Sequence, residues 1–124
     1  MRRSRLLLFL TAVAASAALT AVAHAERKPT TKERIQIASV IHLPAACAHV
    51  RVATTSQKPK WGKVSWRDGG DQCTAMASNG VTIVHKSSGR WRVVTAGSSF
   101  TCSELYDQVP SAVVKDLRIR CVKA

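Results

Sequence analysis

The sequence predicts a small α+β domain in which an antiparallel sheet of about four strands is flanked by an N-terminal helix and a short C-terminal helix. Four short β-rich runs lie between Val50 and Thr95, and turn residues separate them. Helical patterns precede and follow these runs. The chain also has four cysteines, and an even number in a small chain predicts two disulfides.

The first element is predicted as a helix that starts near Thr30. Residues 30–33 read Thr-Thr-Lys-Glu, the form of a capping box in which hydroxyl and carboxylate each bind a free backbone N–H. Helical spacing then places four residues on one side: Arg34, Ile37, Ala38 and Ile41. A strand is the competing interpretation, because the three isoleucines also fit a period of two. We favour the helix, and Pro44 ends the element in either case. The preceding segment, 26–31, is polar and contains Pro29, so we expect it to fray.

Alternation of β-rich residues predicts the strands. Their ranges are 50–55, 61–67, 81–85 and 90–95. The turn at 68–71 contains two glycines, which adopt positive φ at no steric cost, and a turn at 86–89 joins the last two strands into a hairpin. Strict alternation places three side chains on one face of the last strand: Trp91, Val93 and Thr95.

The C-terminal tail is predicted to contain a short helix. Val109, Val113 and Leu117 recur at helical spacing, and Pro110 lies in the first turn, where a missing N–H costs nothing. We expect the apolar face of this helix to lie on the sheet. No structure is predicted for residues 72–79.

The N-terminus has the order of a cleavable signal peptide. A basic start is followed by an apolar run to Val22, and Ala23-His24-Ala25 is a small-x-small cleavage site. An uncleaved anchor is the alternative, because the run is near the lower limit for spanning a bilayer, but the Ala-x-Ala ending favours cleavage. We therefore expect residues 1–25 to be a signal peptide and residues 26–124 to be one secreted domain. Arg2-Arg3 resembles a twin-arginine signal loosely, yet we favour the general secretory route because the cysteines need oxidation outside.

All four cysteines lie in the predicted mature chain: Cys47, Cys73, Cys102 and Cys121. Three pairings are possible. We prefer Cys102 with Cys121 and Cys47 with Cys73, because the first pair brackets one compact segment and the second then ties the front half together. A metal site is the alternative, but no Cys-x-x-Cys occurs, and the cluster of His42, Cys47 and His49 lacks zinc-finger spacing. We expect no metal and no cofactor.

Several short motifs resemble a known group of proteins. Gly89-Arg90-Trp91-Arg92-Val93-Val94 is followed by Cys102, Val109-Pro110, Asp116-Leu117 and Cys121. This pattern resembles small secreted actinobacterial proteins with a GRWRVV hairpin and a Cys, Val-Pro, Asp-Leu, Cys tail. The resemblance covers residues 50–121 and implies the Cys102–Cys121 pairing and an extracellular compartment. The group has no assigned activity, so the resemblance implies no functional residue.

The residues offer little for catalysis. After cleavage the histidines are His42, His49 and His85, and neither Gly-x-Ser-x-Gly nor His-Glu-x-x-His occurs. Turn and capping roles account for the acids Asp68, Asp71, Glu104, Asp107 and Asp116. His85 is expected to be an ordinary half-buried ring. We therefore expect a protein that is not an enzyme.

The strongest functional signal is positive charge. The chain has 19 Lys and Arg against 7 Asp and Glu; the signal peptide takes three arginines, and the remaining 16 give the domain a net charge of +9. Six cations near the tryptophans are candidates for binding an anionic polymer: Lys58, Lys60, Lys63, Arg67, Arg90 and Arg92. Alternation sends Trp91 and Arg92 to opposite faces, which favours a simpler interpretation: Trp66 and Trp91 are core and the cations form a solvated outer face.

These observations predict a secreted, disulfide-stabilised basic domain that works as a non-enzymatic extracellular or cell-envelope binding module. Its partner would be an anionic cell-wall polymer. The alternative is a protein-interaction module, such as an inhibitor of a secreted hydrolase, that uses the segment 72–79 held by Cys73. We expect no nucleic acid partner, and no membrane contact after cleavage.

Overall fold

The computed structural model describes residues 26–54 and 60–123; the predicted signal peptide and Lys58 lie outside this part of the chain. The elements in chain order are α1 (Thr31–Val40), η1 (Ala45–Cys47), β1 (Ala48–Val52), β2 (Trp61–Trp66), α2 (Asp71–Thr74), β3 (Val81–Ser87), β4 (Arg90–Gly97), α3 (Cys102–Gln108) and α4 (Ser111–Asp116). No helix among the described residues is long and apolar enough to cross a bilayer.

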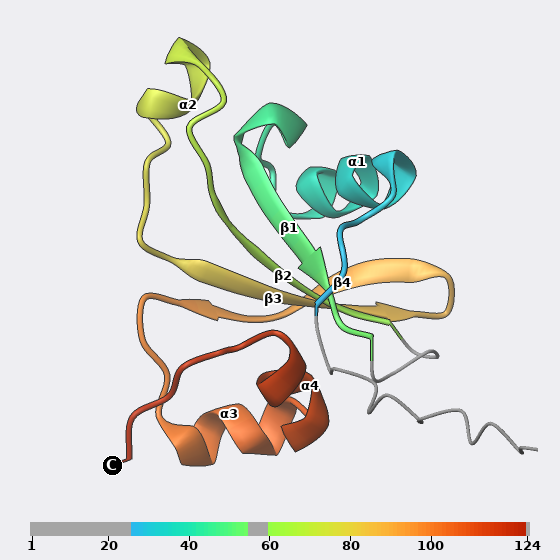
Figure 1. Ribbon diagram of the computed structural model, residues 1–124, viewed down its shortest axis with the longest axis vertical. Helices are drawn as coiled ribbons and strands as arrows, with labels where there is room; N and C mark the ends of the chain where they lie inside the picture. Colours follow the sequence, from blue (N-terminus) through green and yellow to red (C-terminus); the bar gives the residue numbers. More distant parts are fainter. Residues whose placement is uncertain (1–25, 55–59, 124) are drawn as a thin grey trace, which may run out of the picture.

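The strands form one four-stranded sheet in the order β1-β2-β3-β4, and each neighbouring pair is antiparallel. This confirms the predicted α+β class (Figure 1). The hairpin of β3 and β4 is longer than predicted because its turn is only two residues, Ser88 and Gly89. Both adopt positive φ, 52° and 75°, which matches the twist of the flanking strands.

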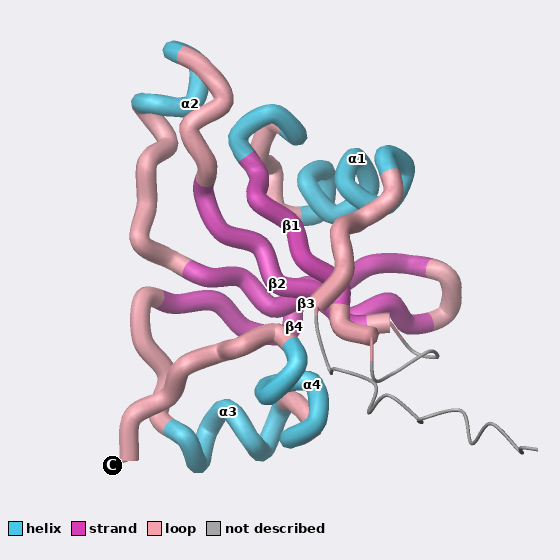
Figure 2. Tube along the Cα trace, in the orientation of Figure 1, coloured by secondary structure: helices cyan, strands magenta, loops and turns pink. Residues whose placement is uncertain are grey.

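Helices cover both faces of the sheet. In Figures 1 and 2, α1 lies on one face and α3 and α4 lie on the other. The α1 side buries Ile37, Ala38, Ala48, Val50, Val64, Val84 and Trp91. The opposite side buries Ala53, Trp61, Ile83, Leu105, Val109, Val113, Val114, Leu117 and Ile119. The predicted packing of the C-terminal apolar face on the sheet is therefore confirmed.

The capping box predicted at the start of α1 is present. The Thr30 hydroxyl accepts a hydrogen bond from the Glu33 N–H at 3.1 Å, and the Glu33 carboxylate accepts one from the Thr30 N–H at 2.9 Å. We expected the preceding segment to fray, but it is held in place because Arg27 forms an antiparallel bridge with Val52. Its two backbone hydrogen bonds, 2.8 and 3.0 Å long, attach the segment to the edge of β1.

The C-terminal region contains two helices where one was predicted. Thr101 caps α3 by accepting a hydrogen bond from the Glu104 N–H, and Pro110 separates this helix from α4. Only Leu105 of α3 is buried, so the helix has almost no apolar periodicity. That is why it was missed, whereas the predicted pattern of Val109, Val113 and Leu117 covers α4 and the residues that flank it.

Both disulfides have the preferred pairing. Cys47 joins Cys73 and so ties η1 to α2, with 5.3 Å between the two Cα atoms. Cys102 joins Cys121 and ties the start of α3 to the C-terminal tail, with a Cα separation of 4.8 Å. The first disulfide therefore starts just before β1, and the second starts just after β4.

Strand β4 carries a bulge that interrupts strict alternation. Ile83 pairs with Thr95 and Val84 pairs with Val93, which leaves Val94 without a Cα partner. Thr95 is therefore shifted to the Ile83 face, while Trp91 packs on the opposite face with Val84. The prediction that Trp91, Val93 and Thr95 share a face is wrong for Thr95. Trp91 is core, as predicted, at 5% exposure, and Trp66 is only half-buried.

Candidate anion-binding site

The described candidates from the sequence do not lie together. Lys60 Nζ lies 3.5 Å from a Glu33 carboxylate oxygen. Lys63 Nζ donates a hydrogen bond to the Leu117 carbonyl and lies 3.8 Å from Glu26. Both lysines are therefore already paired with carboxylates, which lowers the attraction that they offer to an external anion.

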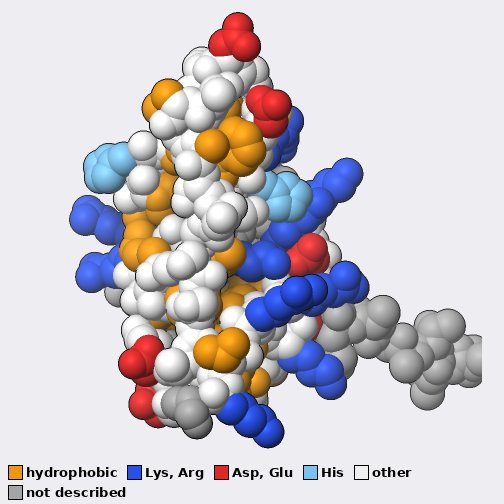
Figure 3. Space-filling model, turned by 90° about the vertical axis from the view of Figure 1, so that its left-hand side faces the viewer, with side chains coloured by type: hydrophobic (Ala, Val, Ile, Leu, Met, Phe, Trp, Pro, Cys, Tyr) orange, Lys and Arg blue, Asp and Glu red, His pale blue; other side chains and the backbone are white. Residues whose placement is uncertain are grey.

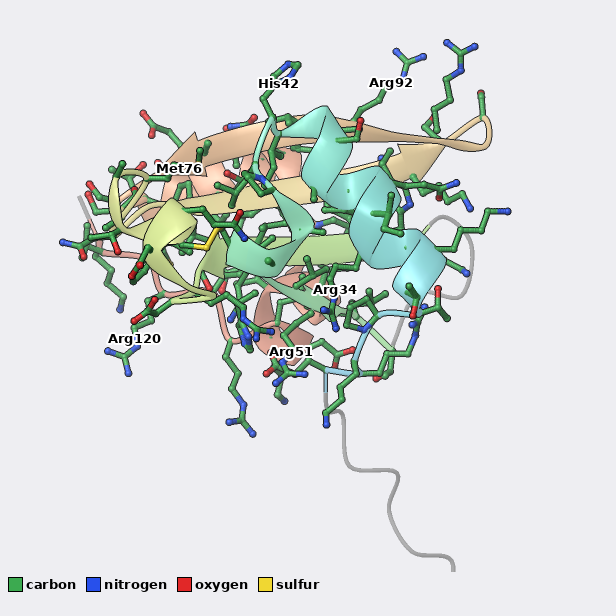
Figure 4. The ribbon with its side chains drawn as sticks, turned by 90° about the horizontal axis from the view of Figure 1, so that it is seen from above. Arg34, His42, Arg51, Met76, Arg92 and Arg120 are labelled. Carbon is green, nitrogen blue, oxygen red and sulfur yellow. A yellow bond between two sulfur atoms is a disulfide. The ribbon has the colours of Figure 1, made fainter. Side chains whose placement is uncertain are left out.

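Arg90 and Arg92 are exposed on β4, away from the other cations. Figure 4 shows Arg92 pointing from one side of the molecule and Arg34, Arg51 and Arg120 pointing from the opposite side. Figure 3 shows the same division: Lys and Arg side chains gather along one edge of the view, and a smaller group lies at the other. Arg67, at the end of β2, lies with residues that were not predicted as a site.

These residues form a hollow of about 310 Å³ beside the edge strand β1, which we call the β1-edge pocket. Its polar lining consists of Lys28, Arg34, His49, Arg51 and Arg67, together with the backbone around Val50. No Asp or Glu is among its lining residues. The pocket therefore concentrates four cations and a histidine without a carboxylate in its wall.

Four separate segments supply these cations. Lys28 follows the bridge between Arg27 and Val52, and Arg34 lies just after the capping box of α1. His49 and Arg51 belong to β1. Arg67 is placed by its own N–H, which donates a 2.8 Å hydrogen bond to the Cys47 carbonyl, next to the first disulfide. The pocket thus depends on the folded arrangement of sheet edge, helix and staple.

The backbone of β1 adds hydrogen-bonding groups to the pocket. β1 is an edge strand, so alternate residues direct their N–H and C=O groups away from β2. Val52 does so, because Arg27 binds both of its backbone groups. By the same alternation the groups of Val50 face outward, and Val50 lines the pocket. An oxyanion there would meet a backbone N–H as well as guanidinium groups.

Electrostatics in the pocket disfavour a further positive charge. The pKa of His49 is lowered, first by burial and then by the charge of Arg51, with smaller contributions of the same sign from Lys63 and Arg67. Glu26 acts in the opposite direction, and it lies 3.6 Å from Arg51. Burial and the neighbouring cations thus both disfavour a charged imidazole, and a bound anion would favour it.

Two further features lie outside the β1-edge pocket, the ring of His85 and a second hollow. His85 stacks on Trp61 with 4.1 Å between ring centroids and is half-buried, as predicted. Within residues 26–54 and 60–123, no three side chains that could ligate a metal lie together. A second hollow of about 480 Å³ contains Trp66 and Met76, and its lining residues are uncharged.

The sequence did not indicate the pocket residues Lys28, Arg34, His49 and Arg51. Lys28 lies in a segment expected to fray, and Arg34 was placed on the same side as Ile37 and Ala38. Arg67 is the one predicted residue in the pocket. Its proximity to Arg51 depends on the pairing of β1 with β2, which alternation alone cannot specify.

Comparisons with known proteins give no further assignment. No protein-family model matches the chain, and neither the curated proteins nor the solved structures contain a match.

Proposed function

We propose that this protein is a non-enzymatic, extracellular or cell-envelope binding module that holds an anionic polymer at the β1-edge pocket. The observation that carries the proposal is the lining of the pocket, where four cations and His49 lie together and, of the four, Arg51 alone is paired with a carboxylate, that of Glu26. Gathering like charges in this way opposes folding. A bound anion would offset that repulsion.

The chemistry of the lining suits an oxyanion. A guanidinium group presents a planar fork of donors that matches phosphate, sulfate and carboxylate oxygens, and three of the four cations are arginines. Lys28, Arg34 and Arg67 form no ion pair with a carboxylate in the described part of the chain. Their charges are thus free to act on an external partner.

The whole chain supports a polymer as the partner. Without the three arginines of the predicted signal peptide, the 16 Lys and Arg and 7 Asp and Glu that remain give the domain a net charge of +9, which attracts polyanions over a distance of about 10 Å at moderate ionic strength. The two disulfides are compatible with an oxidising compartment outside the cell. An anionic envelope polymer is the partner that this charge and compartment favour.

Elution from a phosphorylated polymer column tests the proposal. The purified protein should be retained and released by salt. The double substitution Arg34→Gln with Arg67→Gln should weaken binding about tenfold, at about 0.7 kcal/mol for each cation. The matched control, Arg90→Gln with Arg92→Gln, removes the same charge from the other side and should elute close to wild type.

Two outcomes would contradict the proposal. Elution that does not depend on salt would exclude a charge-based interaction. Equal losses in the two double variants would show that only net charge matters and that the β1-edge pocket has no special role.

The exposed segment after Cys73 favours a second candidate function, a protein-interaction module such as a hydrolase inhibitor. The disulfide to Cys47 and the hydrogen bond from Trp66 Nε1 to the Cys73 carbonyl, 2.8 Å long, hold the base of this segment. Residues 74–79 are exposed, and Met76 is 44% exposed. An inhibitor should capture one defined protein from culture medium, and Met76→Asp should abolish that capture, whereas a polyanion binder should capture no single protein.

A further inference from the structure

A second basic hollow lies on the C-terminal helices. This α4 pocket has a volume of about 580 Å³, and its lining includes Tyr106, Lys115, Arg118, Ile119 and Arg120. Its lining residues include three cations and, like those of the β1-edge pocket, no Asp or Glu. Neither the sequence motifs nor the proposed function accounts for it.

The backbone places these cations in a fixed turn. Arg118 has φ 51° and is one of three non-glycine residues with positive φ among those described. This left-handed conformation ends α4, and the Arg118 and Ile119 N–H groups bind the Lys115 and Val114 carbonyls at 3.2 and 3.0 Å. Ile119, 9% exposed, anchors the turn in the core. Arg118 and Lys115 are thereby held near each other.

The two pockets open along the same side of the molecule. Figure 4 shows Arg34 and Arg51, which line the β1-edge pocket, pointing to the same side as Arg120 of the α4 pocket. Lys63 lies between them, because its ammonium group donates a hydrogen bond to the carbonyl of Leu117, next to Arg118, and is 3.8 Å from Glu26, which also pairs with Arg51. We call the surface formed by the two pockets and Lys63 the basic side.

Charge along the basic side is not uniform. Glu26 lies 3.6 Å from Arg51 and 3.8 Å from Lys63, so it neutralises charge between the pockets. The pocket walls themselves contain no carboxylate. Attraction for an anion is therefore concentrated at two places that are joined by a weaker strip.

We infer that the basic side binds a linear polymer with repeated tetrahedral oxyanions, phosphate or sulfate, whose separate groups occupy the β1-edge and α4 pockets together. This inference rests on the proposed function and adds a second site and a class of partner to it. A polymer that occupies one pocket holds its next groups near the other at a high effective concentration. A single ion has no such advantage.

The aromatic residues argue against recognition of nucleobases. Trp61 and Trp91 are 7% and 5% exposed, and Trp66 lines the uncharged hollow. Among the described lining residues of the two pockets, Tyr106 is the one aromatic side chain. The basic side therefore offers few aromatic rings on which nucleobases could stack, and the two pockets can recognise a polymer by its repeated charges.

Calorimetric titration of the purified protein with tripolyphosphate and with long-chain polyphosphate tests the inference. Tripolyphosphate should bind at two sites in each protein molecule. The long chain should bind at least about 100-fold more tightly at equal phosphate concentration, because one chain spans both pockets. Dextran sulfate in the same assay identifies the oxyanion: the polymer with the larger chain-length gain is the better model of the partner.

Three double variants, each lacking two cations, separate the pockets. Lys115→Gln with Arg120→Gln should weaken one tripolyphosphate site about tenfold and reduce the chain-length gain by about the same factor, and Arg34→Gln with Arg67→Gln should do the same through the other pocket. Arg90→Gln with Arg92→Gln should keep both sites and the gain. Unchanged thermal unfolding will show that the variants are folded, since Arg34 is half-buried and the other five side chains are exposed.

Failure of the two-pocket inference and failure of the proposed function give different results in these titrations. If chain length has no effect, or if the Lys115/Arg120 variant behaves like the Arg90/Arg92 variant, the two-pocket inference is wrong while binding at the β1-edge pocket still stands. If no polyanion binds, both proposals fail. Tighter binding of single-stranded DNA than of polyphosphate at equal charge would also overturn the inference, because bases would then contribute.

Discussion

Glu33 shows how much one side chain can organise in this small domain. It is 6% exposed and lies where the N-terminal segment, α1 and the start of β2 meet. Arg27 donates two hydrogen bonds to its carboxylate, at 2.8 and 2.9 Å, and Lys60 lies 3.5 Å away. These partners, Arg27 first and then the Thr30 N–H, lower the pKa of Glu33 to about 2 in spite of burial.

The pKa of Glu33 predicts an acid-sensitive contribution to stability. Because the folded value of about 2 is below the ordinary 4.5, the contribution is complete above pH 4.5 and is lost as pH falls towards 2. Glu33→Gln should lower the free energy of unfolding at pH 7 by about 2 kcal/mol. Urea unfolding should show the difference between variant and wild type shrinking from pH 5 to pH 2.5.

Glu104 provides the control for Glu33. It occupies the same position in the first turn of α3 but is exposed. Glu104→Gln should change stability by less than about 0.5 kcal/mol. An equal effect of both substitutions would contradict the role given to the Arg27 contact.

The residue-level predictions from sequence succeeded where the cause is local. The capping box is a four-residue pattern, so Thr30 and Glu33 were identified correctly. Arg27 was missed because its role depends on a bridge to Val52, which is distant in sequence. Short patterns show how a helix starts, but they do not show which distant charge will lie on it.

At the level of elements, the contact between the β2–α2 turn and η1 is unusually close. A Cβ atom on Gly69 would lie 2.0 Å from the Ala46 carbonyl oxygen and 3.2 Å from Cys73 Sγ. The glycine is therefore required by the approach of two backbones beside the Cys47–Cys73 disulfide.

Gly69→Ala should lower the free energy of unfolding by about 2 kcal/mol or more, because backbone must move to admit the methyl group. Denaturant unfolding of the oxidised protein measures the loss. Gly80→Ala is the control, since its Cβ would meet chiefly the movable Ser78 hydroxyl at 3.1 Å. Equal stability of the two variants would show that the η1 contact can relax freely.

The elements themselves were predicted unevenly, for physical reasons. Strands and the helix α4 were found because their side chains alternate or recur between core and solvent. The helices α2 and α3 were missed because each buries a single residue, Cys73 or Leu105. The bulge at Val94 was missed because it responds to packing on both faces of the sheet, and the pattern of one strand does not contain that information.

For the whole molecule, composition predicted the sign of the functional surface but not its place. The surplus of Lys and Arg is evident in the sequence. Which cations act together depends on carboxylates that neutralise Lys60 and Lys63 and on the separation of Arg92 from Arg51. Of the six cations that the sequence offered, Arg67 is the one that lines the β1-edge pocket, and the pairing of β1 with β2 places it there.

The position of His49 within this surface predicts pH-dependent binding. Its pKa is lowered by burial, Arg51, Lys63 and Arg67, with Glu26 opposing, so it is neutral at pH 7.5 in the free protein. A bound oxyanion favours the charged ring, so affinity for polyphosphate should rise about fivefold as pH falls from 7.5 to 5.5.

His49→Gln should make that affinity nearly independent of pH over the same range. His42→Gln is the control, because His42 is exposed and points from the opposite side (Figure 4). If the His49 variant keeps the full pH dependence, another group is responsible.

The cations beside β1 also affect how copies of the protein meet one another. An edge strand with open backbone groups is a template for pairing with a second chain, and such pairing leads to aggregation. Here two copies joined edge to edge would bring Arg34, Arg51 and Arg67 of each close to those of the other, and the repulsion opposes that encounter. A polymer that neutralises these charges removes the repulsion. The β1 edge therefore resists pairing between copies in free solution, but it can pair when many copies are bound side by side on one polymer.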